Sequence, residues 1–211
     1  MTLFSPPKWD DIPYAAPNQT IGLFGGTFNP PHDGHALVAE QALTRLDLDA
    51  VWWLVTPGNP LKGHSGLPST QSRVAQINAR YRHPQMIATG LESKLGTHYT
   101  RDSLMRLLQI RPALNFVFII GADNLRGLHR WGGWRDIMQM VPIAVIDRPG
   151  STLSTLHSQA AIHFAHARIR EEDAHQLPYL RPPAWVFLHG PTSQLSSTLL
   201  RSKRAVHGDL P

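Results

Sequence analysis

The sequence has 211 residues, of which 42% are hydrophobic, so the chain is long enough for one domain with a substantial core. It has no cysteine, which excludes disulfides, thiolate metal sites and a cysteine nucleophile, and fits the reducing cytoplasm where we expect the protein to work. The net charge of +5 favours an anionic partner such as a nucleotide, whereas the lack of long basic blocks and long apolar runs argues against a nucleic acid or a membrane.

The first residues, 1–19, are expected to form an irregular N-terminal extension. Prolines interrupt them, and they lack the apolar stretch of a secretory signal. The rest of the chain, 20–211, is expected to form a single domain.

From residue 20 onward, short apolar runs alternate with segments of helical periodicity. The runs are apolar at successive positions, which is typical of strands buried on both faces; they span 20–24, 50–56, 85–89, 115–121, 142–147 and 184–189. Helices are predicted at 34–46, 70–82, 101–110, 154–170 and 197–204, with Ser69 or Thr70 and Thr100 as candidate N-caps. The alternation predicts an α/β, Rossmann-like fold: a mostly parallel sheet, helices on both faces and ligand sites at the carboxyl ends of the strands.

The first strand runs into "GLFGGTFNPPHDGH" at residues 22–35. Gly25 and Gly26 allow positive φ and leave no Cβ to block a ligand, and the prolines keep the chain extended. His32 and His35 then fall where the next helix begins, so that they can donate hydrogen bonds to phosphate oxygens beside free backbone N–H groups. The alternative is a tight turn with two incidental histidines. The string matches neither a Walker A loop nor a dinucleotide G-x-G-x-x-G.

Two later loops add polar side chains. "TPGNPLKG" at 56–63 supplies Asn59 and Lys62, and "THYTRDSL" at 97–104 supplies Tyr99 and Thr100. The first of these two strings follows a predicted strand, where the fold is expected to place its ligands.

The central strand ends in "FVFIIGADNL", which places Asp123 at a strand carboxyl end, where it can accept from a ribose or approach a metal. "LHRWGGWRDI" follows, with Trp131 and Trp134 around two glycines. An aromatic face beside exposed backbone N–H groups suits a flat heterocycle that carries a carboxylate. The alternative is that the tryptophans anchor the loop in the core, and for Trp134 we favour this alternative.

The last third of the chain contains two further patterns. His163 and His166 share one face of a predicted helix, which a solvated surface explains more simply than a metal site. "SQLSSTLLRSK" at 193–203 places Ser196, Ser197 and Thr198 at a helix start, one turn before Arg201. Hydroxyls, backbone donors and a guanidinium suit a polyphosphate, although an ordinary N-cap with a surface arginine is the alternative.

The string "GLFGGTFNPPHDGH" resembles the H-x-G-H motif of a nucleotidyltransferase superfamily. The string "SQLSSTLLRSK" is similar to the I-S-S-T-x-x-R signature of the same superfamily, with Leu195 in place of Ile. Together with "NPLK", "YT", "IIGADNL", the tryptophan segment and "RPG", they resemble bacterial nicotinate-nucleotide adenylyltransferases from about residue 21 to 204. Gly132 departs from this pattern, because many members carry an aromatic residue there.

The resemblance implies three sets of site residues. Catalytic residues would be His32, His35 and Arg201. ATP would be bound by Gly25, Gly26, Thr27, Phe28, His32, His35, Asp123, Arg148, Ser196, Ser197, Thr198 and Arg201. Nicotinate mononucleotide would be bound by Asn59, Lys62, Tyr99, Thr100, Trp131 and Gly132.

The implied reaction transfers AMP from ATP to nicotinate mononucleotide, with Mg²⁺ carried on ATP oxygens. The alternatives keep the fold and change the acceptor to nicotinamide mononucleotide, phosphopantetheine or a glycerol- or choline-type phosphate. A non-catalytic nucleotide-binding regulator and an RNA-binding or aminoacylating protein are alternatives of other classes. The presence of His32, His35, Ser197 and Arg201 argues against the regulator, and the absence of a "KMSKS"-like string argues against aminoacylation.

Overall fold

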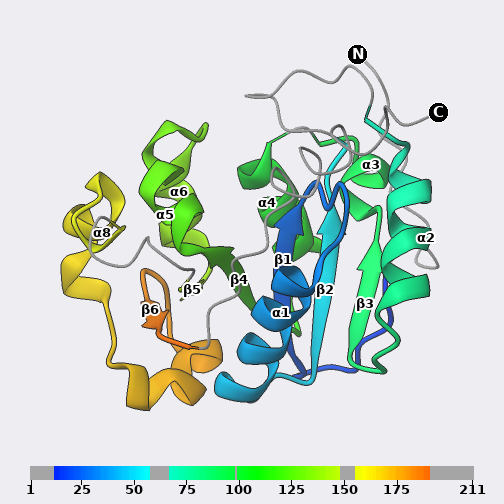
Figure 1. The fold of residues 1–211 in the computed structure, drawn as a ribbon. Helices are drawn as coiled ribbons and strands as arrows, with labels where there is room; N and C mark the ends of the chain where they lie inside the picture. Colours follow the sequence, from blue (N-terminus) through cyan, green and yellow to red (C-terminus); the bar gives the residue numbers. More distant parts are fainter. Residues whose placement is uncertain (1–11, 58–66, 98, 148–154, 191–211) are drawn as a thin grey trace.

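The computed structural model describes residues 12–57, 67–97, 99–147 and 155–190, which contain one six-stranded sheet (Figure 1). Every strand pairs in parallel with its neighbours, in the order β3-β2-β1-β4-β5-β6. The strands are β1 Thr20–Gly26, β2 Ala50–Val55, β3 Met86–Thr89, β4 Asn115–Gly121, β5 Ile143–Ile146 and β6 Trp185–Leu188. The predicted Rossmann-like fold is confirmed, and the sheet is parallel throughout.

Helices cover both faces of this sheet (Figure 1). One face carries α1 Asp33–Arg45, α2 Thr70–Arg80 and the 3-10 helix η4 Glu171–Tyr179. The other carries α3 Leu91–Leu95, α4 Thr100–Ile110, α5 Ala122–Gly127, the 3-10 turn η2 Leu128–Arg130, α6 Trp134–Met140 and α8 Gln159–His163. Two hydrophobic clusters, one per face, therefore hold the domain together.

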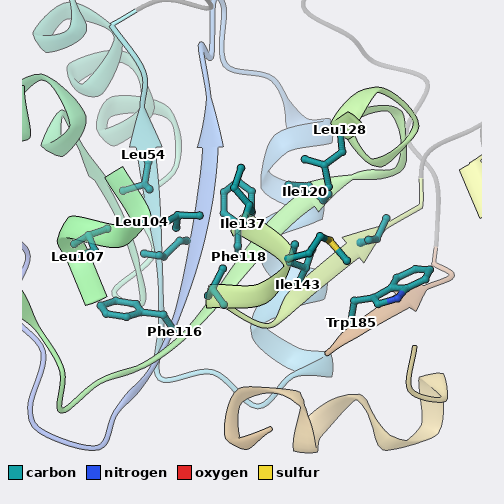
Figure 2. Packing of buried hydrophobic residues seen from close by; sticks show 14 of the residues in the cluster. Leu54, Leu104, Leu107, Phe116, Phe118, Ile120, Leu128, Ile137, Ile143 and Trp185 are labelled. Atoms are coloured by element: carbon teal, nitrogen blue, oxygen red, sulfur yellow. The ribbon is translucent and has the colours of Figure 1, made fainter. Parts of the chain in front are cut away.

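Strand β2 shows why the apolar runs lack alternation. Trp52 packs in the cluster with α3 and α4, whereas Trp53 packs in the cluster with α1 and α2, and neither is exposed. Figure 2 shows the first cluster, to which Leu54 and Phe118 of the sheet and Ile137 of α6 belong. Successive side chains of a strand point to opposite faces, so a strand covered on both sides has to be apolar at every position.

Most of the predicted elements lie within a few residues of the observed ones, and Ser69 is confirmed as the N-cap of α2, its Oγ accepting from the Ser72 N–H at 3.1 Å. The single helix predicted at 154–170 is wrong: the described part forms α8 and the 3-10 turn η3 Ala165–Ala167. Backbone pairing of Ile169 with Trp185, N to O 2.9 Å, holds the following segment beside β6. The helix predicted at 197–204 lies outside the described residues.

The segment before β1 has neither helix nor strand in its described part, residues 12–19. Ile12 and Ala15 are nevertheless buried in the cluster with α3 and α4, and the Asn18 N–H donates to the Ala113 carbonyl at 2.6 Å. This part of the N-terminal segment therefore packs against the domain, and a boundary at residue 19 stays a prediction. Among the described residues, no helix is long and apolar enough to cross a membrane.

Candidate active site

The strand order reverses between β1 and β4, the two central strands. In open parallel sheets, ligands bind in the crevice beyond the carboxyl ends of the strands at such a reversal. The β1–α1 loop with its histidines follows β1, and Asp123 lies exposed in the first turn of α5 directly after β4. The topology thus brings these two predicted site segments to the same edge of the sheet.

His32 and His35 are placed by the first turn of α1. His32 is the N-cap and His35 is the third helical residue, so the two rings meet on one side of the helix start. The rings stack with their centroids 3.7 Å apart and their planes at 25°, and both side chains are buried. They lie at the end of the helix that carries unsatisfied N–H groups and partial positive charge, which attracts anions.

The backbone of His32 sets the tautomer of His35. The His32 N–H donates to Nδ1 of His35 at 3.2 Å, so Nδ1 has to be unprotonated. A neutral imidazole with an accepting Nδ1 carries its proton on Nε2. His35 is therefore prepared as a hydrogen-bond donor through Nε2.

An aromatic cluster supports the His35 ring from behind. Phe28 packs edge-on against it at 4.9 Å between centroids, and Phe28 and Trp53 are 5.1 Å apart. The loop reaches this packing through a positive φ of 47° at Phe28, while neither Gly25 nor Gly26 has a positive φ. The positive φ expected at these glycines is thus wrong: β1 stays extended through Gly26, where an added Cβ would meet the Phe28 ring at 2.9 Å. Gly26 makes room for a side chain of its own loop.

Arg73 of α2 ties this loop to the next one and was missed from the sequence. Its guanidinium is fully buried and donates to three carbonyls, those of Thr27 at 2.7 Å, Pro68 at 2.9 Å and Pro57 at 3.5 Å. Burial lowers the pKa of this guanidinium, because the charged form loses water. Its one sequence signal is its place four residues before Ile77, on the buried face of the helix.

The end of α2 braces the start of α1. Asp33, the first residue of α1, accepts from Arg80 Nη2 and from the Tyr81 hydroxyl, each at 2.9 Å. The hydrogen bond from Arg80 is the main reason that the pKa of Asp33 lies below its ordinary value. Burial raises the pKa of Tyr81 to about 12, helped by the hydrogen bond with Asp33. Tyr81 also stacks on Trp53 at 5.7 Å, so this contact joins the histidine loop to the core.

The structure brings together the predicted nicotinate mononucleotide residues that it describes. Tyr99 is the N-cap of α4 and Thr100 its first helical residue, which corrects the prediction of Thr100 as N-cap. A Cβ on Gly132 would lie 3.7 Å from the Tyr99 ring. Trp131 packs edge-on against Phe118 of β4 at 6.5 Å. Tyr99 therefore lies beside Gly132, the position at which the sequence departs from the pattern that it resembles.

Trp134 is a core residue, as predicted. It is buried among α6 and α8 and packs edge-on against Phe164 and His163, with centroids 6.0 Å and 5.6 Å apart. Gly133 precedes it with a positive φ of 69°, and the Arg101 side chain covers the space where a Cβ would stand. The segment 131–134 is thus shaped on one side by core packing and on the other by α4.

Several predicted site residues lie outside the described residues. They are Asn59, Lys62, Arg148, Ser196, Ser197, Thr198 and Arg201.

Comparison with known proteins gives one consistent result. Residues 23–203 match the family model described as cytidylyltransferase-like. A protein of Agrobacterium fabrum named "Probable nicotinate-nucleotide adenylyltransferase" is 54% identical over 182 residues, covering 86% of this chain and 97% of the relative. A relative of the same name from Rhizobium meliloti is 52% identical over 185 residues, covering 88% and 98%.

Among solved structures, the chain is similar to the nicotinic acid mononucleotide adenylyltransferase of Plasmodium falciparum, solved in complex with NaAD. The TM-score is 0.66 at 16% sequence identity, covering 88% of this chain and 83% of that one. At this identity the likeness concerns the fold.

Proposed function

The chain belongs to the cytidylyltransferase-like family and, within it, to the bacterial nicotinate-nucleotide adenylyltransferases, and we propose that its His32–His35 loop binds the ATP that supplies the AMP. The enzyme transfers AMP from ATP to nicotinate mononucleotide, which yields nicotinate adenine dinucleotide and pyrophosphate in NAD biosynthesis. The family predicted from the sequence is thereby confirmed. We place the reaction in the cytoplasm, where ATP is available.

The stacked histidine pair carries the proposal for the ATP site. It lies at the positive end of α1, at the edge where the strand order reverses, with Nε2 of His35 protonated by its tautomer. A triphosphate needs several donors in one place, and a helix start with two imidazoles supplies them.

The remaining contacts follow the motifs. ATP is held by Gly25, Gly26, Thr27, Phe28, His32, His35, Asp123, Arg148, Ser196, Ser197, Thr198 and Arg201. Nicotinate mononucleotide is held by Asn59, Lys62, Tyr99, Thr100, Trp131 and Gly132. Thr100 and the backbone near Gly132 meet the nicotinate carboxylate, and the contact between Tyr99 and Gly132 supports this grouping.

The chemistry needs positioning more than proton transfer. A phosphate oxygen of nicotinate mononucleotide attacks the α-phosphorus of ATP and forms a P–O bond. The bond from that phosphorus to the bridging oxygen breaks, and pyrophosphate leaves with the electron pair. The attacking phosphate is already an anion near neutral pH, because the second pKa of a phosphate monoester is about 6, so no general base is required. His32, His35 and Arg201 donate to the charge that builds up on the phosphates.

Mg²⁺ is proposed to arrive with ATP. Within the described ranges, no group of three or more His, Asp or Glu side chains is placed to hold a metal ion. The His35 Nδ1 already accepts from the His32 N–H, so this atom is not available as a metal ligand. The two stacked rings are better suited to donate hydrogen bonds to phosphate. These residues fit a cation held by phosphate oxygens and water. When bound, the ion neutralises part of the phosphate charge.

An assay of acceptor choice tests the substrate side. Purified protein, ATP and Mg²⁺ are incubated with nicotinate mononucleotide, nicotinamide mononucleotide or phosphopantetheine, and pyrophosphate release is followed. We expect the fastest release with nicotinate mononucleotide. No release with either pyridine nucleotide would overturn the proposal.

Substitution of His35 tests the role of the histidine pair. His35→Ala is expected to lower kcat by on the order of a hundredfold, because a donor to the transition state is lost. His35→Gln places an amide N–H near the position of Nε2 and is expected to recover part of this loss. A glutamine could not replace a general base in this way. If the kcat of His35→Gln were as low as that of His35→Ala, the donor role would be contradicted. His175→Ala, at an exposed histidine of η4, is the control and is expected to leave kcat unchanged.

A further inference from the structure

A carboxyl group is buried under the predicted nicotinate mononucleotide side of the site, and no step of the reaction uses it. Glu92 lies in the first turn of α3 with 7% of its surface exposed. Carboxylates are rarely buried without a partner, because the charged form loses its water. Burial raises the pKa of Glu92 to about 7, and a hydrogen bond with Ser103 opposes part of that rise.

Ser103 connects this carboxyl to the start of α4. The side chain of Ser103 is buried one turn into α4 and pairs with Glu92. Its Oγ also lies 2.8 Å from Thr97 Oγ1 and 3.3 Å from the carbonyl of Tyr99. Three groups thus meet one hydroxyl: a carboxyl from α3, a hydroxyl before α4 and the backbone of the N-cap.

The described residues between α3 and α4, which are 96, 97 and 99, are held by the same two helices. Gly96 ends α3 with a positive φ of 63°, and the Thr97 N–H and hydroxyl both approach the Glu92 carbonyl, at 3.2 Å and 3.4 Å. The Tyr99 carbonyl accepts from the Asp102 and Ser103 N–H groups at 3.0 Å and 3.1 Å. Glu92 therefore contributes both its backbone and its side chain to one buried clamp across the turn.

We infer that Glu92 is a positioning residue for nicotinate mononucleotide, acting through Ser103 to hold Thr97, Tyr99 and Thr100 in place. The inference rests on the proposed function, in which Tyr99 and Thr100 contact this substrate. A hydroxyl donates one hydrogen bond and accepts up to two, and the Tyr99 carbonyl can only accept, so Ser103 Oγ can bond Glu92, Thr97 and Tyr99 together in only one arrangement of protons. The carboxyl thereby fixes the rotation of the hydroxyl, and a buried network is rigid only when all its members are satisfied.

Three variants test the clamp. Glu92→Leu fills the space and removes the hydrogen bond, and Ser103→Ala removes the connecting hydroxyl. Each is expected to raise KM for nicotinate mononucleotide about tenfold, the value of one buried hydrogen bond, while KM for ATP changes less than about twofold. Glu92→Gln keeps a side chain that can both donate to and accept from Ser103, and is expected to stay within about twofold of wild type for both substrates. If Glu92→Leu does not fold, Ser103→Ala and Glu92→Gln still decide.

The matched control is Thr20→Val. Thr20 is also a buried hydroxyl bound to a carboxylate, with Oγ1 2.9 Å from Asp49 Oδ2, but it lies at the amino end of β1, away from the site. It is expected to lower stability without separating the two KM values. Hydrogen–deuterium exchange of ligand-free protein gives a readout free of substrate: the Glu92→Leu and Ser103→Ala variants should exchange faster at residues 99–104.

The outcomes separate the two proposals. If wild type does not turn over nicotinate mononucleotide, the proposed function fails. If wild type does, but Glu92→Leu or Ser103→Ala leaves its KM unchanged or raises both KM values equally, the positioning role of Glu92 is overturned. Glu92→Gln behaving like Glu92→Leu would also overturn it, because the hydrogen bond would then be irrelevant.

Discussion

Glu92 also makes the stability of the protein depend on pH. Its pKa of about 7 in the fold exceeds the ordinary 4.5, so the folded state keeps a proton that the unfolded chain has already lost. The contribution of Glu92 to the free energy of unfolding therefore falls as pH rises from 4.5 to about 7, by on the order of 3 kcal/mol in total. Above this window the contribution is constant.

The corresponding prediction concerns Glu92→Gln, which is neutral at every pH. The free energy of unfolding of this variant, minus that of wild type, should be larger at about pH 8 than at about pH 5. Urea denaturation at both pH values measures this difference. A difference between the two proteins that is the same at both pH values would mean that Glu92 titrates normally.

At the scale of the element, α2 does more than cover the sheet. It carries Arg73, whose guanidinium joins the loops after β1 and β2 through the carbonyls of Thr27 and Pro57. A buried cation is stable only while its hydrogen bonds replace the lost water. The shape of the proposed ATP loop therefore depends on a helix that itself need not touch ATP.

Arg73→Met is expected to lower the free energy of unfolding by on the order of 3 kcal/mol, because buried carbonyls lose their donors, and to raise KM for ATP. Urea denaturation and steady-state kinetics measure the two effects. The control is Arg80→Met on the same helix, whose side chain is 54% exposed in its pair with Asp33 and should cost less than about 1 kcal/mol. Equal losses in both variants would contradict the bridging role of Arg73.

At the scale of the whole molecule, one ionic cluster joins segments that are far apart in the chain. Glu171 of η4 accepts from Arg45 at the end of α1 at 2.9 Å, and from the backbone and ring of His189 after β6 at 2.8 Å and 2.7 Å. Burial alone would raise the pKa of Glu171, but the bonds from His189 and Arg45 outweigh it and hold the pKa below its ordinary value.

A lowered carboxyl pKa contributes stability above the ordinary pKa of 4.5, and this contribution is lost as pH falls through the lower value in the fold. Glu171→Gln is therefore expected to destabilise the protein by about 1 kcal/mol at about pH 7 and by much less at about pH 3. Urea denaturation at both pH values checks this, with Glu172→Gln at the exposed neighbouring residue as control. A loss that persists in acid would show that the charge of Glu171 is not its source.

The features that the sequence predicted are local ones. The adjacent Trp52 and Trp53 indicate a strand buried on both faces. His32 and His35 are three residues apart at a helix start, so the stacking of their rings depends on the geometry of α1 alone. The family could be predicted from the sequence for the same reason, because its motifs are short continuous strings. Helices such as α3, with five residues, are too short to show a period. The helix predicted at 154–170 ends at Phe164 and a 3-10 turn, after which Arg168 and Ile169 pair with distant β6.

The sequence by itself determined the α/β class, the position of the loop proposed to bind phosphate and the family, because periodicity and motif spacing act over a few residues. Only the tertiary structure decided which distant segments meet. Phe28 rather than a glycine takes the positive φ since its ring has to reach His35 over Gly26. Arg73 and Glu92 are buried because other elements of the fold pack against them. The partners of their side chains, such as Thr27 and Ser103, come from other parts of the chain, so the sequence alone could not show these contacts.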